Sequence, residues 1–403
     1  MQVLLDGRIV LPRMTGAGRY VIEIARRLPK LDRDLSIQLL LLPLLKQTEI
    51  PKALEQAGVS IKYCDVRVSS VRGWAVIPWL LRRLRPDLYH CPFLALPYVH
   101  VPSVMTIYDL NPILMPEYLG RRAVLRRFVA RRLLGSALRR CRIAIAISDA
   151  VHAEVEEHFP EGRGKIRTIH LGVDPTHWSL TVAQSGGREL LNDGSPWAGR
   201  PYALYVGVDR PHKNLVRLVR AFVRFRASAQ WPNRARPYLW LAGVGAGSRH
   251  LRGEIEALNC IDSVRLTAAL TESSLQRAYN GARVVTYVST SEGFGLPILE
   301  ALAAGVPVVA GSASSLPEVA GDAATYVSPV DEIDIARGLD LTWRDEALRR
   351  SLAERGAQRV REFSWETTAR ETLQAYSDAI CEPRTTDGPA TAPSRIVNEG
   401  STH

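Results

Sequence analysis

Two glutamates, Glu292 and Glu300, stand eight positions apart with a glycine-rich turn and a proline between them. Residues 284–288, just before them, are β-branched and aromatic, which predicts a buried strand. Pro297 suits the first turn of a helix, which we expect to stop at Gly305. A strand, a glycine turn and a helix N-terminus offer free backbone N–H groups and a positive dipole end to a phosphate. Because the two carboxylates can accept hydrogen bonds from hydroxyl groups beside that phosphate, the pattern predicts a nucleotide-sugar site.

The segment SEGFGLPILEALAAGVPVVAG and its continuation to Pro329 resemble the signature of glycosyltransferase family 4. Members of that family are retaining transferases of GT-B architecture, with two facing Rossmann-like domains and an interdomain cleft. The resemblance implies that Glu292 contacts hydroxyl groups of the donor sugar and that Glu300 binds the ribose. It also implies that the sugar and the diphosphate meet the backbone of Gly293, Phe294, Gly295 and Leu296. A pair of solvated helix charges is the alternative interpretation of the glutamates.

The rest of the chain alternates strand-like and helix-like segments, which predicts an α/β fold with parallel sheets covered on both faces. We expect strands at residues 1–5, 104–107, 143–147, 202–206, 239–242, 284–288 and 306–310. The length of 403 residues suggests two or three domains. Ligands of such sheets bind beyond the carboxyl ends of the strands, so two facing domains would close on a substrate between them.

Composition and resemblance together suggest five segments. We expect an N-terminal, acceptor-side Rossmann-like domain at residues 1–180 and a linker, rich in Gly, Asn, Ser and Pro, at residues 181–200. A C-terminal domain that binds the nucleotide-sugar would follow at residues 201–364. Residues 365–382 resemble the family's last helix, which crosses back to the first domain. Residues 383–403 have the composition of a disordered tail.

A glycine loop follows the first predicted strand. Gly16 and Gly18 stand in the sequence Thr-Gly-Ala-Gly-Arg-Tyr, which is similar to the family's Gly-x-Gly-Arg-Tyr loop. Glycine lets the backbone approach a phosphate or a sugar closely, so both residues are candidate donor contacts. An ordinary tight turn is the alternative. A dinucleotide fingerprint would place a third glycine where Val21 stands, which disfavours a dehydrogenase.

Two further motifs of the first half supply candidate catalytic residues. His90 lies in a segment that resembles the family strand ending in His-x-Pro, whose histidine reaches the donor sugar. A hydrogen-bonded structural histidine is the alternative. Asp109 is a candidate for contacting the acceptor. Tyr108 stands where many relatives carry histidine, so this chain departs from the family pattern there.

In the second half, residues 206–214 are similar to the family loop whose cations neutralise the diphosphate leaving group. Lys213 aligns well with that pattern. Arg210 is displaced, and His212 stands where arginine is usual. We expect Lys213 and Arg210 to bind the donor, with a solvated loop charge as the alternative for Arg210.

The expected mechanism uses Glu292, His90 and Asp109 and needs no metal or other cofactor. No carboxylate matches a family nucleophile near His90, so the resemblance implies a front-face route in which the departing phosphate helps to deprotonate the acceptor. Asp32 and Asp34 form a D-x-D pair of the kind that binds a cation in another transferase fold. They fall in a polar turn remote in sequence from the donor motif, so we expect no metal site there.

The positive charge is concentrated in the first half of the chain. Residues 1–180 hold 27 basic against 16 acidic residues and carry the whole net charge of +11. Between Arg121 and Arg142, arginines alternate with apolar residues at helical spacing, which favours contact with an anionic membrane that holds a lipid-linked acceptor. A core-facing helix with a solvated arginine face is the alternative. No motif supports nucleic-acid binding.

The chain shows no signal peptide and no apolar run of spanning length, and its five cysteines lack metal-type spacing. We therefore expect a cytoplasmic enzyme, bound peripherally at the inner face of the plasma membrane. Its expected activity is transfer of a sugar from a nucleotide-sugar to a glycan or lipid-linked acceptor in the synthesis of a cell-surface polysaccharide such as lipopolysaccharide. Similarity of the TIYDL and SSLPEV segments to polysaccharide mannosyltransferases favours GDP-mannose. A nucleotide-sugar epimerase of the same architecture and a non-catalytic sugar-nucleotide-binding scaffold at a membrane surface are the alternatives.

Overall fold

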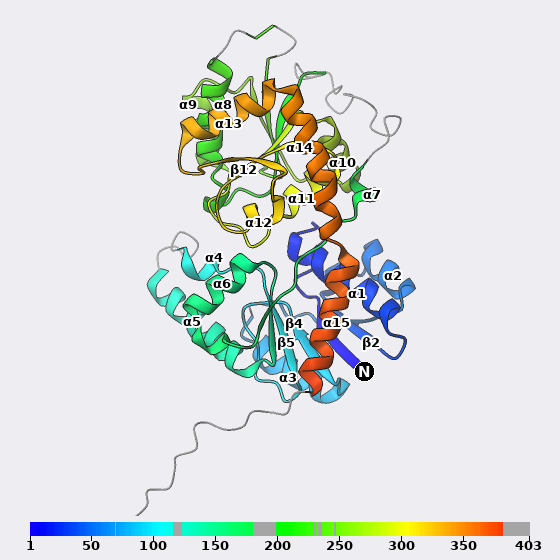
Figure 1. The fold of residues 1–403 in the computed structure, drawn as a ribbon. Coiled ribbons are helices and arrows are strands. Elements are labelled where there is room, and N and C mark those ends of the chain that lie inside the picture. The colour runs from blue at the N-terminus through cyan, green and yellow to red at the C-terminus, as the bar shows by residue number, and fades with distance from the viewer. Residues whose placement is uncertain are drawn as a thin grey trace, which may run out of the picture.

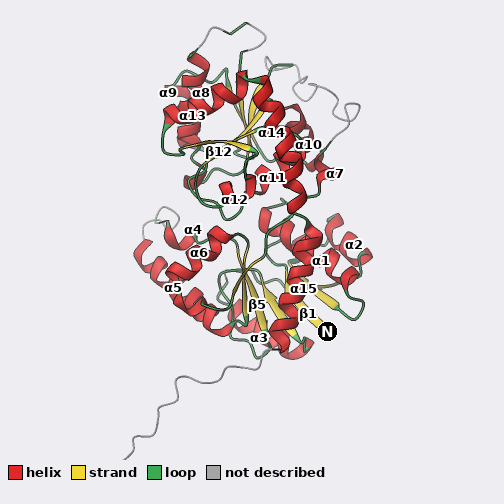
Figure 2. Ribbon diagram, in the orientation of Figure 1, coloured by secondary structure: helices red, strands yellow, loops and turns green. Residues whose placement is uncertain are grey.

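A computed structural model shows two α/β lobes joined at a waist (Figure 1). It describes residues 1–68, 70–115, 123–179, 199–228, 231–232, 236–245 and 247–381. The predicted linker lies almost entirely outside the described residues, as does the predicted tail. Helices cover both faces of each sheet (Figure 2).

The first lobe contains a seven-stranded parallel sheet in the order β3-β2-β1-β4-β5-β6-β7. Its strands are short and mostly buried, as apolar β-branched runs in a doubly covered sheet must be. The strands are β1 Gln2–Asp6, β2 Ser36–Leu41, β3 Ser60–Tyr63, β4 Leu88–Cys91, β5 Ser103–Ile107, β6 Ile143–Ala146 and β7 Ile166–Thr168. The helices are α1 Gly16–Leu31, α2 Glu49–Gln56, α3 Gly73–Leu84, α4 Asn111–Leu114, α5 Ala123–Arg140 and α6 Asp149–His158. The short helix α7 Pro175–Trp178 follows β7 and packs against helices of the second lobe (Figure 1).

The second lobe contains a six-stranded parallel sheet in the order β10-β9-β8-β11-β12-β13. Its strands are β8 Tyr202–Val206, β9 Tyr238–Ala242, β10 Val264–Thr267, β11 Val284–Tyr287, β12 Val308–Gly311 and β13 Ala324–Val327. The helices are α8 Leu215–Ala227, α9 Arg249–Ala257, α10 Glu272–Gly281, α11 Leu296–Ala303, α12 Leu316–Ala320, α13 Glu332–Arg344 and α14 Glu346–Arg359. Short 3-10 turns stand at Pro43–Leu45, Pro160–Gly162, Pro211–Lys213 and Val360–Glu362.

The last helix, α15 (Trp365–Cys381), returns from the second lobe and packs against α1 and β5 of the first (Figure 1). Ion pairs fix it at both ends: Glu366 accepts from Arg27 Nε at 2.7 Å, and Asp378 pairs with Arg167. The two lobes are therefore joined by α15 as well as by the chain between β7 and β8.

In each sheet the strand order reverses beside the first strand, between β1 and β4 and between β8 and β11. Crevices at such reversal points, beyond the carboxyl ends of the strands, are the usual binding sites of doubly wound sheets. The loops after β9 and β11 and the loop after β1 all reach the waist, because residues of each contact the opposite lobe. The waist is thus the place where a ligand held by both sheets would sit.

Each predicted strand corresponds to an observed strand to within two residues at either end. No helix among the described residues is long and apolar enough to cross a membrane. The five cysteines are free thiols, four of them buried.

Candidate active site

The loop after β11 supplies an anion-binding backbone. Gly295 has φ of 114°, a conformation that favours glycine, and it starts α11 without a side-chain cap. The first N–H groups of a helix have no intrahelical partner, and Pro297 lacks one altogether. This turn therefore offers backbone N–H groups and the positive end of α11 to a phosphate.

Glu292 is held in that loop by a buried cation. Lys213 Nζ lies 2.6 and 2.7 Å from the two carboxylate oxygens of Glu292 and donates to Tyr287 Oη at 2.7 Å. Burial alone would lower the pKa of Lys213, but the charge and the hydrogen bond of Glu292, together with Tyr205 and Asp109, outweigh it and the pKa is raised. The ammonium group thus stays charged beside the anion-binding turn. The sequence-predicted residues Glu292 and Lys213 are brought together.

Asp109 faces this pair from the first lobe. The backbone carbonyl of Tyr108 lies so close to Gly293 that a Cβ on Gly293 would be 1.7 Å from that oxygen. Burial raises the pKa of Asp109, the charge of Glu292 adds to the rise, and Lys213 opposes it. Asp109 also accepts from the Asn111 N–H at 2.9 Å, which fixes its orientation. The carboxyl group therefore lies within electrostatic reach of Glu292 and Lys213, across the waist.

Glu300 lines a separate cavity of about 230 Å³ between the lobes. Its Oε2 accepts from Tyr279 Oη at 2.9 Å. Burial raises the pKa of Glu300, while Arg19 and Tyr279 oppose the rise. Arg19, from the glycine loop of the first lobe, donates to Glu272 at 2.9 Å and lies 5.4 Å from the centre of the Trp178 ring. A carboxylate and an aromatic wall in one cavity suit a ribose and its base, which is compatible with the predicted role of Glu300.

The two predicted loop glycines differ in position. A Cβ on Gly16 would lie 3.4 Å from Leu296 Cδ1, so Gly16 faces the start of α11. Gly18 is buried within the first lobe and donates its N–H to Thr15 Oγ1, the N-cap of α1. Only Gly16 is therefore placed at the waist.

His90 lies away from the waist, in the core of the first lobe. It is fully buried, and its ring nitrogens lie 2.7 Å from Tyr376 Oη and 2.8 Å from Thr106 Oγ1. Burial lowers its pKa to about 3, so the ring is neutral. Both nitrogens are occupied by side chains, which leaves neither for a sugar. The predicted contact of His90 with the donor finds no support in this geometry, because the returning helix α15 covers the histidine.

Replacing His90 with alanine is expected to lower the free energy of unfolding by about 2–4 kcal/mol, since the buried Tyr376 hydroxyl loses its hydrogen-bond partner and Thr106 Oγ1 keeps only Tyr20 Oη. Neutral His90 has a folded-state pKa below the unfolded value of about 6.5, so its contribution is complete above that pH and is lost as pH falls towards 3. Urea titrations at pH 7.5 and pH 5 measure the free energy of unfolding of both proteins. The difference between the wild type and His90→Ala should be smaller at pH 5. The exposed His100→Ala is the control. Unchanged stability with a large loss of turnover would instead support a chemical role.

Arg210 is exposed and lines a second cavity with Arg217, Arg220 and His250. His212 is buried in the loop beside Lys213, and burial lowers its pKa to about 4. The prediction that Arg210 helps to bind the diphosphate therefore has no contact to support it among the described residues. Arg13 and Arg19 were not assigned from sequence, yet both reach the second lobe. Arg13 donates to the Gly243 carbonyl at 2.9 Å.

Two clusters that contain carboxylates lie outside the loop after β11. Asp32 and Asp34 lie in the turn between α1 and β2, where the Met1 amino group donates to the Asp34 carbonyl. This is the amino end of the strands, opposite to the waist. Asp149, His170 and Glu318 form a cluster within ligand distance, but both Glu318 oxygens already accept backbone N–H groups at the N-terminus of α6. A positive helix end disfavours a cation at that point.

Comparison with known proteins identifies a family for each half of the chain. The family described as "Glycosyltransferase Family 4" matches residues 14–177, and that described as "Glycosyl transferases group 1" matches residues 189–359. The chain belongs to glycosyltransferase family 4. This glycosyltransferase is 27% identical over 389 residues to O-antigen chain mannosyltransferase B of Escherichia coli, covering 93% of this chain and 99% of that protein. It is 26% identical over 300 residues to the serotype-specific mannosyltransferase WbdA of Escherichia coli, covering 73% of this chain and 36% of WbdA.

Solved structures confirm the predicted GT-B fold of two facing α/β domains. Sucrose-phosphate synthase from Thermosynechococcus elongatus matches the glycosyltransferase with a TM-score of 0.73 and 19% identity, over 93% of this chain and 98% of that one. WaaG, a glycosyltransferase involved in lipopolysaccharide biosynthesis, matches with a TM-score of 0.70 and 17% identity, over 93% and 99%. At these identities the likeness concerns the fold alone.

Proposed function

We propose that this glycosyltransferase moves mannose from GDP-mannose, with retention of configuration, to a lipid-linked glycan acceptor in the synthesis of a cell-surface polysaccharide. The observation that carries the proposal is the placement of Glu292, Lys213 and the free helix start at Leu296 in one loop, facing Asp109 of the other domain. The relatives named as mannosyltransferases of an O-antigen chain support the choice of mannose and of the acceptor class.

The side chains suggest the following division of labour. The start of α11 and Lys213 bind the diphosphate and stabilise the negative charge that grows on it as the anomeric bond breaks. Glu292 accepts hydrogen bonds from the sugar hydroxyl groups, and the two hydrogen bonds from Lys213 fix the orientation of this carboxylate. Asp109 orients the acceptor hydroxyl on the same side as the leaving phosphate, and that phosphate takes the proton. Oxygen attack on the face that the phosphate leaves gives retention without a covalent sugar–enzyme bond.

Donor choice provides the test of this proposal. GDP should bind at least tenfold more tightly than UDP by calorimetry, and GDP-mannose should give a glycosylated product with a polyprenyl diphosphate-linked glycan. We expect the rate to be unchanged in excess chelator, because Lys213 and a helix dipole can supply the positive charge. Tighter binding of UDP would refute the donor assignment. Loss of turnover in chelator that manganese restores would refute metal independence.

We also propose that α5 docks on an anionic membrane surface. Its second half is core, but its first half exposes apolar side chains, with Leu125 at 60% and Phe128 at 55% exposure. Arg132 lies 4.9 Å from the centre of the Phe128 ring, so cations and apolar groups share this surface. A core-facing helix alone would not leave these residues in water, whereas a lipid interface would bury them beside anionic headgroups.

The double substitution Leu125→Ser and Phe128→Ser is expected to weaken binding to anionic vesicles about tenfold, because two apolar anchors are lost. Co-sedimentation with vesicles of phosphatidylglycerol and phosphatidylcholine measures this. Ile261→Ser, at a comparably exposed apolar residue of the second domain, is the matched control and should bind like the wild type. Equal binding of both variants, or none by the wild type, would leave α5 as an ordinary helix.

A further inference from the structure

The residues that begin the short helix α12 hold the loop after β11, residues 288–295, in place; this loop is called the donor loop below. Ser315 Oγ lies 2.9 Å from the Glu292 carbonyl and 2.8 Å from the Phe294 carbonyl, and Ser314 Oγ donates to the Glu292 carbonyl at 2.7 Å. These are the backbone groups on either side of Gly293. Any movement of α12 is therefore transmitted directly to the loop that carries Glu292.

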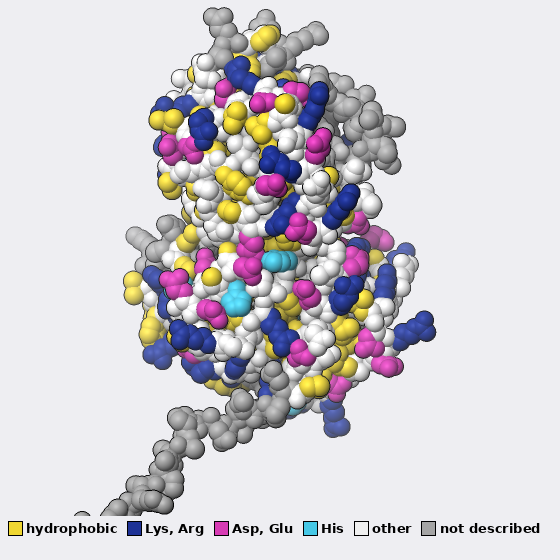
Figure 3. Space-filling model, in the orientation of Figure 1, with side chains coloured by type: hydrophobic (Ala, Val, Ile, Leu, Met, Phe, Trp, Pro, Cys, Tyr) yellow, Lys and Arg dark blue, Asp and Glu magenta, His cyan; other side chains and the backbone are white. Residues whose placement is uncertain are grey.

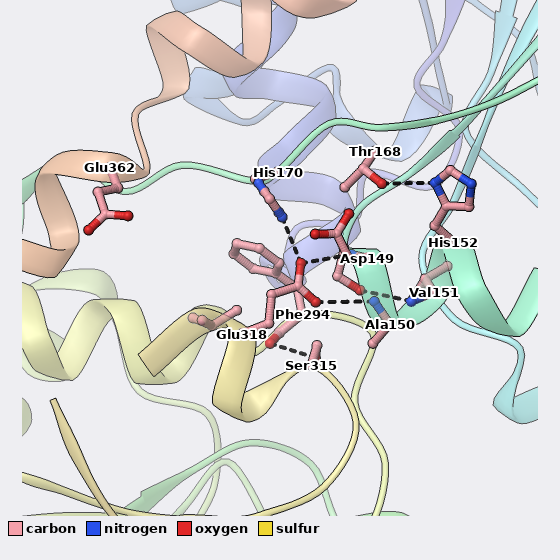
Figure 4. A network of polar contacts seen from close by, with 12 residues as sticks. Asp149, Ala150, Val151, His152, Thr168, His170, Phe294, Ser315, Glu318 and Glu362 are labelled. Atoms are coloured by element: carbon pink, nitrogen blue, oxygen red, sulfur yellow. Dashed lines mark hydrogen bonds and ion pairs between the residues drawn. The ribbon is translucent and has the colours of Figure 1, made fainter. Parts of the chain in front are cut away.

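The same helix is anchored to the opposite domain through Glu318, one turn further on. Glu318 Oε1 accepts from the Asp149 N–H at 2.7 Å and from His170 Nε2 at 2.6 Å, and Oε2 accepts from the Ala150 N–H at 3.1 Å (Figure 4). The carboxylate thus caps the N-terminus of α6, where a negative charge interacts favourably with the helix dipole. Arg359 donates to the Glu318 and Val319 carbonyls and keeps α12 on its own domain.

A second contact joins the two domains within this cluster. Ser148, the N-cap of α6, accepts from the Val151 N–H at 3.1 Å and donates its hydroxyl proton to the Gly293 carbonyl at 2.7 Å. The N-terminus of α6 therefore binds both the donor loop and the helix that supports it. Acidic and histidine side chains gather at the waist on this face of the molecule (Figure 3).

We propose that Glu318 is a positioning residue that couples domain closure to the geometry of the donor loop. When Glu318 caps α6, the domains are closed, Gly293 lies against the Tyr108 carbonyl, and Glu292 faces Asp109. When this cap is released, Glu318 no longer holds α12 and the donor loop against the first domain. The part of the inference that concerns the donor rests on the function proposed above, whereas the closure itself does not.

His170 makes this contact sensitive to pH. It lies in the crossing between the domains, faced by Glu318 of α12, Asp149 of α6 and Glu371 of α15, with the ring of Phe363 against it. The hydrogen bond with Glu318 raises the pKa of His170, burial opposes it, and the other carboxylates add to the rise. Since protonated His170 strengthens the contact, closure is favoured fully below about pH 6.5 and weakens as pH rises through the raised pKa.

Small-angle X-ray scattering of the free, full-length protein at about pH 6 and pH 8 tests the coupling without any donor. The wild type should have the smaller radius of gyration at pH 6. Glu318→Gln, which keeps the shape but removes the charge, should have the larger radius at both pH values, and His170→Gln should show no pH dependence. Glu362→Gln is the matched control, because Glu362 pairs with Arg359 on the same side of the waist within one domain. It should behave like the wild type.

Kinetics on the same variants test the effect on the donor loop. Glu318→Gln should raise the KM for GDP-mannose about tenfold at pH 6 and by a smaller factor at pH 8. A wild-type radius and wild-type KM in Glu318→Gln would overturn the inference, and a wild type without pH response would overturn the role of His170. If GDP fails to bind the wild type, the proposed donor is wrong, while the scattering still decides whether Glu318 closes the domains.

Discussion

Replacing Gly293 with alanine is expected to lower kcat about 100-fold while weakening the binding of the nucleotide by a much smaller factor. The added Cβ would lie 1.7 Å from the Tyr108 carbonyl, so the domains would have to stay apart by more than an ångström. A displacement of that size between reacting groups costs about two orders of magnitude in rate. Nucleotide binding is expected to weaken less than turnover, because the proposed phosphate contacts come from the second domain and only the cavity around Glu300 is lined by both domains.

Steady-state kinetics and calorimetry with the nucleoside diphosphate measure the two quantities separately. Gly253→Ala is the control, since a Cβ there meets open space in α9. A wild-type kcat in Gly293→Ala would show that the chemical step does not require the close approach of the two domains.

The fold was predictable because its signals are local. Strands such as residues 202–206 and 284–288 are short apolar runs between turn residues, and α11 is bracketed by Pro297 and Gly305. The predicted end of α11 was nearly correct: the helix ends at Ala303 and Gly305 follows with φ of 70°. In the second domain, Glu292 was predicted from the strand, turn and helix start around it, whereas Lys213 was predicted because its loop resembles that of the family. Both lie in loops directly after strands of one sheet.

Contacts between the domains were not predictable, because they depend on how two separately folded units meet. His90 has the sequence setting of a cleft residue, but α15, 286 positions away, supplies the Tyr376 hydroxyl that takes one of its nitrogens. Glu318 lies in a segment that resembles the family and looks like a first-turn acid of a short helix. Only the structure, which places α6 of the first domain opposite Glu318, reveals that this carboxylate caps a helix of the other domain. The arginine in Gly-x-Gly-Arg-Tyr was a signal that could have suggested Arg19.

Replacing the carboxylates of Glu292 and Glu300 by amides, one at a time, is expected to change different kinetic constants. Glu292→Gln should lower kcat about 100-fold with a small change in donor KM, because it weakens contacts to the sugar and to Lys213 that matter most as charge develops. Glu300→Gln should raise the KM for GDP-mannose and the Kd for GDP about tenfold and change kcat little, since a ribose contact is equally strong before and during bond breaking.

The double-mutant cycle of Glu292→Gln with Lys213→Met then separates their ion pair from their individual roles. Strict additivity would mean that the two residues act independently on the donor, and an unchanged GDP affinity in Glu300→Gln would remove the ribose from this cavity.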